Sequence, residues 1–131
     1  MNLQVPLDFD DSRAYPLVLV LHGYGANGFA QQAYFGLGGL GSGGDAIVLA
    51  PDGLVDSNAS QFWNADEVCC DFDNQDPDDV AYLGGLVDDV MDDWPIDPRA
   101  VFAIGHSNGG FMSYRLACER SDVFAGIVVL A

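Results

Sequence analysis

Four short, uninterrupted apolar runs constrain the fold of this 131-residue chain more than any other feature. They cover residues 18–21, 46–50, 100–104 and 126–130. Each contains β-branched residues and lacks the alternation of apolar and polar residues that marks a strand with one face in water. The pattern is typical of strands buried on both faces of a parallel sheet. Because parallel strands need long crossover connections, we expect a helix between successive runs.

Helical patterns do occupy the segments between these runs. The clearest has apolar residues at helical spacing, namely Val80, Leu83, Leu86, Val87, Val90, Met91 and Trp94. Asp76 as N-cap, Pro77 as the first helical residue and Asp79 as the third predict where this helix begins. Two further helices are predicted over residues 27–37 and 108–119.

This order predicts an α/β fold, one domain over residues 1–131 with a doubly wound, mostly parallel sheet and helices on both faces. Residues 2–7 are compatible with an additional edge strand. Residues 36–44 hold six glycines in nine positions and are predicted to form a loop. In such sheets a site lies at the carboxyl ends of the strands, so we look for functional residues just after residues 21 and 104.

The charge balance is strongly acidic, with 18 Asp and 2 Glu against 4 Arg and no Lys, a net charge of −16 and a pI near 4.1. Four scattered arginines cannot form the basic groove that nucleic acid or an anionic membrane requires. No apolar run approaches the roughly 18 residues of a membrane span. An excess of Asp without Lys suits a saline environment, in which salt screens self-repulsion; a lineage-wide preference for Asp explains it equally well. No secretion signal is visible, so the compartment stays open.

The pentapeptide Gly105-His106-Ser107-Asn108-Gly109 fits the pattern G-x-S-x-G and lies between a predicted strand and a predicted helix. In acyl-transfer enzymes this turn holds a serine in a strained conformation with its hydroxyl projecting, and the flanking glycines avoid clashes. Ser107 is therefore the candidate nucleophile. The alternative is a glycine-rich turn that happens to contain a serine.

A second motif, His22-Gly23-Tyr24-Gly25, follows the first apolar run. Enzymes of this architecture place one donor of the oxyanion hole there and the other directly after the nucleophile. We therefore predict that the backbone N–H groups of Tyr24 and Asn108 form the oxyanion hole. The alternative is a glycine-rich turn beside a core histidine.

With these motifs in place, the chain resembles the α/β-hydrolase superfamily, and within it the polyhydroxybutyrate-depolymerase and feruloyl-esterase-like branch. The likeness rests on matching segments in matching order: residues 16–23, 51–53, 63–64, 69–70, 78–80, 96–99, 107–110 and 114–119. It implies a serine carboxylesterase for short-chain or aryl esters that needs no metal or organic cofactor. It also implies Ser107 as nucleophile and Tyr24 and Asn108 as oxyanion residues.

The chain departs from the superfamily after Ser107. The family's triad runs Ser, then Asp or Glu, then His, yet only 24 residues follow Ser107 and none is a histidine. Asp122 precedes the last strand and does not match the family's acid. The resemblance thus covers the amino-terminal part of a hydrolase core. A shortened gene product, a compact enzyme with a rearranged base, and a catalytically silent binding or assembly module all remain open.

Both histidines lie near the candidate nucleophile. His22 ends the strand expected beside the strand that leads to Ser107, and we take it as the tentative base. A histidine there more often packs under the oxyanion loop. His106 adjoins Ser107 in sequence, but neighbouring side chains at a sharp turn diverge, so a structural role is expected for it.

Three cysteines and an acidic stretch are the remaining candidates for chemistry. Cys69, Cys70 and Cys118 have neither the number nor the spacing of a zinc site; one disulfide with a free thiol and three reduced thiols both stay open. Residues 71–79 lack the ligand pattern of a calcium-binding EF-hand loop and are predicted to be a solvated entry to a helix. No dedicated metal site is therefore expected, and binding of an adventitious cation at this stretch stays open.

Two further expectations concern surfaces. Phe62 and Trp63 with Tyr24 and Phe29 either line an acyl or aryl pocket or belong to the core. The run 126–130 has no charged residue or proline that would prevent it from pairing with a strand of another molecule. If it lies at an open sheet edge, we expect homodimerisation through that edge.

Overall fold

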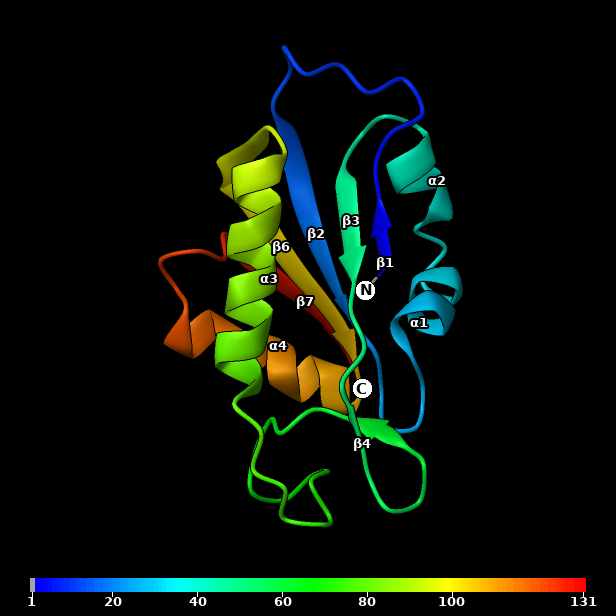
Figure 1. Ribbon diagram of the computed structural model, residues 1–131, viewed down its shortest axis with the longest axis vertical. Coiled ribbons are helices and arrows are strands. Elements are labelled where there is room, and N and C mark those ends of the chain that lie inside the picture. Colours follow the sequence, from blue (N-terminus) through cyan, green and yellow to red (C-terminus); the bar gives the residue numbers. More distant parts are fainter. Residues whose placement is uncertain (1) are drawn as a thin grey trace.

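A computed structural model describes residues 2–131 and contains a five-stranded central sheet in the order β1-β3-β2-β6-β7 (Figure 1). The strands are β1 (Asn2–Gln4), β2 (Tyr15–Leu21), β3 (Ile47–Ala50), β6 (Ile96–His106) and β7 (Gly126–Leu130). The last four are mutually parallel, and β1 runs antiparallel to β3 at one edge. The predicted α/β class is confirmed, and each of the four apolar runs lies in one parallel strand.

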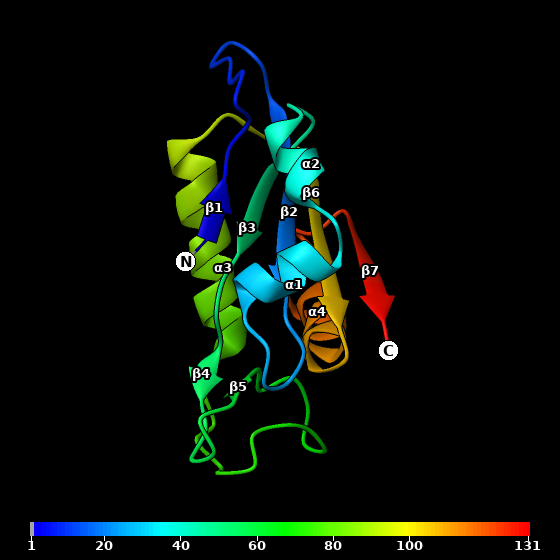
Figure 2. The same ribbon diagram turned by 90° about the vertical axis from the view of Figure 1, so that its right-hand side faces the viewer.

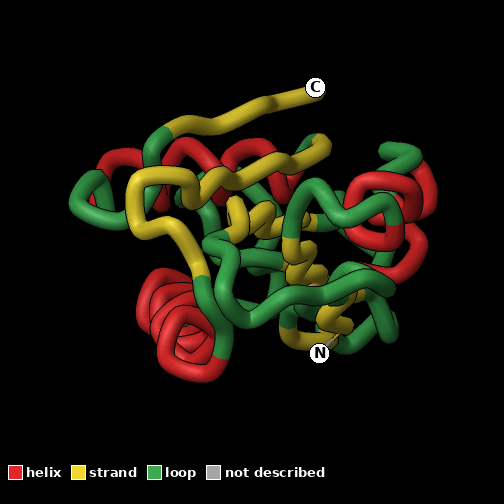
Figure 3. The backbone as a smooth tube through the Cα atoms, turned by 90° about the horizontal axis from the view of Figure 1, so that it is seen from above, coloured by secondary structure: helices red, strands yellow, loops and turns green. Residues whose placement is uncertain are grey.

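Helices cover both faces of this sheet. They are α1 (Gly28–Tyr34), α2 (Gly38–Ser42), α3 (Asp79–Asp93) and α4 (Asn108–Glu119). Helices α1 and α2 lie on one face, and α3 and α4 lie on the other (Figures 2 and 3). None of the helices within residues 2–131 is long and apolar enough to cross a lipid bilayer.

The larger part of the core lies between the sheet and the helices α3 and α4. Alternate residues of β2 point to this side, and they pack against the apolar stripe of α3 predicted from helical spacing. The members from α3 and α4 are Val80, Leu83, Val87, Val90, Met112 and Leu116. A smaller cluster around Val20 and Val48 packs under α1 and α2. Burial on both faces explains why β2 and β3 are continuously apolar. Burial of both faces was wrongly predicted for residues 126–130: β7 is the outer strand, and its Val128 and Leu130 are exposed.

The sheet register decides which loops meet. Strands β2 and β6 pair from Leu17 opposite Val101 to Leu21 opposite Gly105. The segments that directly follow these strands, residues 22–25 and 106–108, therefore leave the sheet side by side at its carboxyl edge. These segments carry both motifs found in the sequence.

Three local predictions were wrong or incomplete. The glycine-rich segment 36–44 contains the short helix α2, and the preceding helix α1 ends at Tyr34 rather than at residue 37. A two-stranded sheet, β4 (Leu54–Val55) with β5 (Gln61–Phe62), was not predicted. Strands of two residues carry too little hydrophobic periodicity to be recognised.

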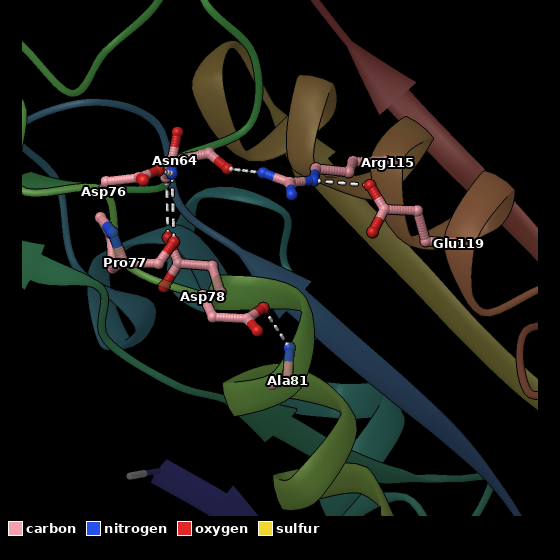
Figure 4. A network of polar contacts seen from close by, with 8 residues as sticks. Asn64, Asp76, Pro77, Asp78, Ala81, Arg115 and Glu119 are labelled. Atoms are coloured by element: carbon pink, nitrogen blue, oxygen red, sulfur yellow. Dashed lines mark hydrogen bonds and ion pairs between the residues drawn. The ribbon is translucent and has the colours of Figure 1, made fainter.

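The start of α3 also differs from its prediction. The N-cap is Asp78, whose carboxylate accepts a hydrogen bond of 2.9 Å from the backbone N–H of Ala81, and not Asp76 (Figure 4). The side chain of Asp76 instead accepts a hydrogen bond of 3.0 Å from the side chain of Asn64. The helix therefore starts two residues later than Pro77 suggested, because Asp76 is engaged by a loop distant in sequence.

Candidate active site

Ser107 occupies the turn between β6 and α4, with its side chain exposed at the carboxyl edge of the sheet. Its backbone has φ 51° and ψ −117°, in the positive-φ region that residues other than glycine rarely adopt. The backbone N–H of Ser107 donates a hydrogen bond of 2.8 Å to the carbonyl of Leu130 in β7. The hydroxyl makes no capping hydrogen bond to α4 and is thus free for other partners.

The two glycines that flank Ser107 are required by close backbone packing. A Cβ on Gly105 would lie 2.1 Å from the carbonyl oxygen of Gly109. A Cβ on Gly109 would lie 2.3 Å from the carbonyl oxygen of Leu21 in β2. Helix α4 therefore starts in direct backbone contact with both β2 and β6, and this contact fixes the position of Ser107.

The turn after β2 lies against Ser107. A Cβ on Gly23 would lie 3.6 Å from the Cβ of Ser107, so the two backbones are close neighbours. Within residues 2–131, the backbone N–H groups of Tyr24 and Asn108 have no hydrogen-bond acceptor, although their neighbours Gly25 and Ser107 do. Two unsatisfied N–H donors thus come from the two segments that meet at Ser107.

His22 is fully buried beneath this turn. Its Nε2 accepts a hydrogen bond of 3.0 Å from the backbone N–H of Gly53, which requires the proton to be on Nδ1. Nδ1 lies 2.9 Å from the carbonyl oxygen of Gly23 and donates to it. Burial holds the pKa of His22 below its usual value. Because neither nitrogen faces Ser107, we do not retain His22 as the base.

His106 does not supply the base either. Its ring packs against Tyr34 of α1, with 5.5 Å between ring centroids, and its Nδ1 lies over Gly23. No hydrogen bond joins Ser107 to either histidine of the chain. The structural role expected for His106 agrees with this packing.

Asn108 and Trp63 form a buried link that the sequence did not suggest. The side-chain carbonyl of Asn108 accepts a hydrogen bond of 2.8 Å from the backbone N–H of Trp63, and its amide donates one of 2.9 Å to the carbonyl of the same residue. The indole N–H of Trp63 donates a hydrogen bond of 3.0 Å to the carbonyl of His22. The partners lie more than 40 positions apart, so no local signal could have found them.

Gln31 of α1 is a second residue that the sequence did not reveal. Its side chain is buried, and its carbonyl oxygen accepts a hydrogen bond of 3.1 Å from the backbone N–H of Gly23. This contact holds the peptide between His22 and Gly23, one residue before Tyr24. A polar side chain on a short surface helix gives no sign in the sequence that it is buried.

The aromatic residues divide between core and surface. Phe62 and Trp63 are fully buried, so the core interpretation holds for them, whereas Phe29 is exposed. The hydroxyl of Tyr24 donates to the carboxylate of Asp56 and thereby lowers the pKa of Asp56. Its ring contacts that of Phe72 edge to face, with 5.3 Å between centroids. The side chain of Tyr24 thus points away from Ser107's helix and into the 56–72 region.

A polar network around Asn64 holds the segment that follows Trp63 (Figure 4). The backbone N–H of Asn64 donates a hydrogen bond of 2.7 Å to the buried carboxylate of Asp79, and its carbonyl accepts one of 2.7 Å from Arg115 of α4. Burial raises the pKa of Asp79 to about 6, although the Asn64 hydrogen bond and the charge of Arg115 act in the opposite direction. Arg115 also pairs with Glu119 at 2.8 Å.

Asp79→Asn is expected to change the pH dependence of stability. The pKa is raised from 3.8 unfolded to about 6 folded, so the wild type loses stability relative to the variant as pH rises from 4 to 7. The difference should reach about 2–3 kcal/mol, since each pKa unit corresponds to roughly 1.4 kcal/mol. Urea unfolding at pH 4 and pH 7 measures it. Exposed Asp92→Asn, in the last turn of α3, is the control; an equally large pH-dependent change there would refute the assignment to Asp79.

Three other features were candidates for chemistry: a cavity, the cysteines and possible metal ligands. A cavity of about 680 Å³ is lined by residues of the 64–76 loop and by Arg115, and Ser107 does not line it. Cys69 and Cys70 are paired as a disulfide, and Cys118 is an exposed free thiol. Within the part of the chain that the structure describes, no group of three or more acidic, His or Cys side chains is placed to hold a metal ion.

Known proteins share this arrangement of elements. The structure superposes on the Bacillus cereus carboxylesterase with a TM-score of 0.67 and 25% sequence identity, over 98% of this chain and 57% of that one. A thermostable esterase gives a TM-score of 0.62 at 21% identity, covering 95% of this chain and 35% of the other, which supports the fold alone. The chain has the fold of the α/β-hydrolase superfamily. No protein-family model matches it.

The chain's sequence relatives include named esterases. Feruloyl esterase C of Emericella nidulans is 35% identical over 135 residues, which are 98% of this chain and 44% of the relative. Feruloyl esterase D of Neurospora crassa is 28% identical over 141 residues, covering 99% of this chain and 44% of the relative. The chain thus spans less than half the length of the curated relatives it matches.

Proposed function

We propose that this chain carries the nucleophile and the oxyanion hole of a serine carboxylic-ester hydrolase. The observation that carries the proposal is the backbone of Ser107, held at φ 51° between β6 and α4 with its hydroxyl exposed. A serine adopts such a strained conformation only where the surrounding structure imposes it, and backbone strain of this kind is concentrated at functional sites. The esterase relatives support the same assignment.

In the proposed reaction the Ser107 oxygen attacks the ester carbonyl carbon, and the carbonyl π electrons move onto oxygen. The N–H groups of Tyr24 and Asn108 stabilise the resulting oxyanion. Collapse of the tetrahedral intermediate breaks the bond to the alcohol oxygen, which takes a proton from water and leaves as the alcohol, and an acyl-Ser107 ester remains. Water then attacks this acyl-enzyme, releasing the carboxylic acid and restoring the serine hydroxyl.

The proton of Ser107 passes to solvent in this chain, because both histidines face other partners. Oxyanion stabilisation and binding without a complete triad retain about 10³ to 10⁴-fold catalysis over water in a comparable hydrolase. We therefore expect slow but serine-dependent acylation that becomes faster as pH rises.

Short-chain and aryl esters are the proposed substrates. Ser107 is exposed at the carboxyl edge of the sheet, so a small acyl group can reach it without entering a deep pocket. Feruloyl esterase C of Emericella nidulans is by its name an esterase of feruloyl groups. The net charge of −16 repels polyanions, so nucleic acid and anionic membranes are not proposed partners.

The test is burst release from p-nitrophenyl acetate at micromolar protein. One equivalent of p-nitrophenol is expected from the wild type, and Ser107→Ala should lose the burst. Ser121→Ala, an exposed serine beyond α4, is the matched control and should keep it. A burst that survives Ser107→Ala would refute the proposal.

A second candidate, a catalytically silent hydrolase-like binding or assembly module, is favoured by one observation. Both histidines are packed away from Ser107 in structural roles. Absence of any burst from the folded wild-type chain would favour this module over the enzyme.

We also propose that two copies pair through the outer edge of β7. No strand within residues 2–131 covers this edge, and Val128 is 55% exposed there. Unpaired N–H and carbonyl groups on an uncharged strand recruit another strand. Sedimentation at micromolar concentration should give a dimer, and Val128→Lys should give the 14.0 kDa monomer. A wild-type monomer at this concentration would contradict the pairing.

A further inference from the structure

The two proposed oxyanion donors come from separate parts of the chain. Tyr24 follows β2, and Asn108 begins α4. The last backbone pair between β2 and β6 is Leu21 with Gly105, so the sheet register ends before either donor is reached. An additional set of contacts must therefore fix the distance between them.

The segment around β5 holds both ends of the turn that carries Tyr24. The indole N–H of Trp63 donates to the carbonyl of His22 at 3.0 Å, and the carbonyl of Gln61 accepts from the backbone N–H of Gly25 at 2.8 Å. Tyr24 lies between these two ties. Its own N–H is left without an acceptor and is therefore available to a ligand.

The same segment also holds the other donor. Asn108 is fully buried, and its side chain bonds both backbone groups of Trp63, at 2.8 and 2.9 Å. Because the acceptor and donor of one amide are both used, this contact fixes the orientation of the α4 start as well as its position. Trp63 is also fully buried, with its ring 4.8 Å from that of His22.

From these contacts we propose that Trp63 is a positioning residue that joins the N–H donors of Tyr24 and Asn108 into one preorganised oxyanion hole. Its backbone holds Asn108, and its indole N–H holds the turn before Tyr24. Preorganised donors stabilise a transition state because they need not reorient as charge develops. This inference rests on the proposed esterase function, since it assigns a role to Trp63 in that reaction.

Trp63→Phe tests the inference because it keeps a buried aromatic ring and the backbone contacts to Asn108 but removes the indole N–H. Trp94→Phe is the matched control: Trp94 is half-buried and packs edge to face on Phe9, at 5.2 Å, remote from Ser107. We expect Trp63→Phe to lower kcat for p-nitrophenyl acetate about 10 to 100-fold with KM changed less than threefold, because loss of one oxyanion donor costs about 10²–10³-fold. Trp94→Phe should stay within twofold in both constants.

Amide hydrogen exchange gives a readout independent of turnover. The backbone N–H of Gly25 is protected by its hydrogen bond to Gln61, and that of Gly53 by its hydrogen bond to His22. Exchange of both should be at least tenfold faster in Trp63→Phe and unchanged in Trp94→Phe. Unchanged kcat in folded Trp63→Phe would overturn the positioning role. If the wild type shows no burst, the proposed function is wrong, and the role of Trp63 is then judged from the exchange rates alone. Unchanged exchange at Gly25 and Gly53 in Trp63→Phe would overturn the proposal that Trp63 holds this turn. If Trp63→Phe does not fold, Asn108→Asp, which keeps the acceptor for Trp63 but removes the donor, is judged by the same kinetic and exchange criteria.

Discussion

Gly109→Ala is expected to lose at least about 4 kcal/mol of stability, a large part of the 5–15 kcal/mol that holds a domain of this size together. The added Cβ would lie 2.3 Å from the carbonyl oxygen of Leu21 and 2.6 Å from that of His22. Both are backbone atoms in or next to β2, so relief of the clash requires α4 to move off the sheet. Urea unfolding followed by circular dichroism measures the loss.

Gly85→Ala is the control for this prediction. Gly85 lies on the exposed face of α3, and nothing lies within 4 Å of the position its Cβ would occupy. Alanine there should raise stability by about 0.5–1 kcal/mol, because glycine is a poor helix former. A Gly109→Ala protein as stable as wild type would show that α4 does not contact β2 as described.

Sodium chloride is expected to raise Tm by roughly 5–10 °C between 0.01 and 1 M. We propose that the chain is adapted to salt: 20 acidic residues face 4 arginines, and three of those arginines, Arg99, Arg115 and Arg120, make the ion pairs present in the structure. Screening shortens the reach of a charge from about 30 Å to about 3 Å over this range. A gain of about 2 kcal/mol corresponds to the stated rise in Tm.

The shape of the salt response separates screening from general salting-out. Screening saturates, so most of the rise should occur below about 0.5 M. Sucrose at matched osmolality, which does not screen charge, is the control and should produce a smaller and linear rise. A Tm that stays flat or falls with added salt would contradict the proposed adaptation.

The strands, α4 and the location of Ser107 were predictable from the sequence because local pattern determines them. Continuous apolar runs identify the parallel strands, and residues 126–130 form β7 as predicted, although Val128 and Leu130 of this outer strand are exposed. Helix α4 has the predicted bounds, 108–119, because the turn glycines before it and the apolar periodicity within it agree. The start of α3 was misplaced because a distant side chain, that of Asn64, engages Asp76.

The orientation of the His22 side chain shows what the local sequence pattern does not determine. Its position after β2 correctly placed it next to the strand that leads to Ser107. The direction of its ring depends on Gly53, 31 positions later, whose N–H meets Nε2. The link between Asn108 and Trp63 likewise spans 45 positions. Contacts of this kind join loops whose relative placement exists only in the folded sheet, so they could not be predicted from spacing.

The most direct test of the account is the site at which a fluorophosphonate attaches. After incubation of the folded chain with the probe, digestion and mass spectrometry should find the phosphonyl group on the peptide containing Ser107 and on no other serine, since this exposed hydroxyl lies beside the N–H groups of Tyr24 and Asn108, which have no acceptor within residues 2–131. Denatured protein should not be labelled. Labelling of another serine, or none in folded protein, would contradict the assignment of Ser107 as the nucleophile.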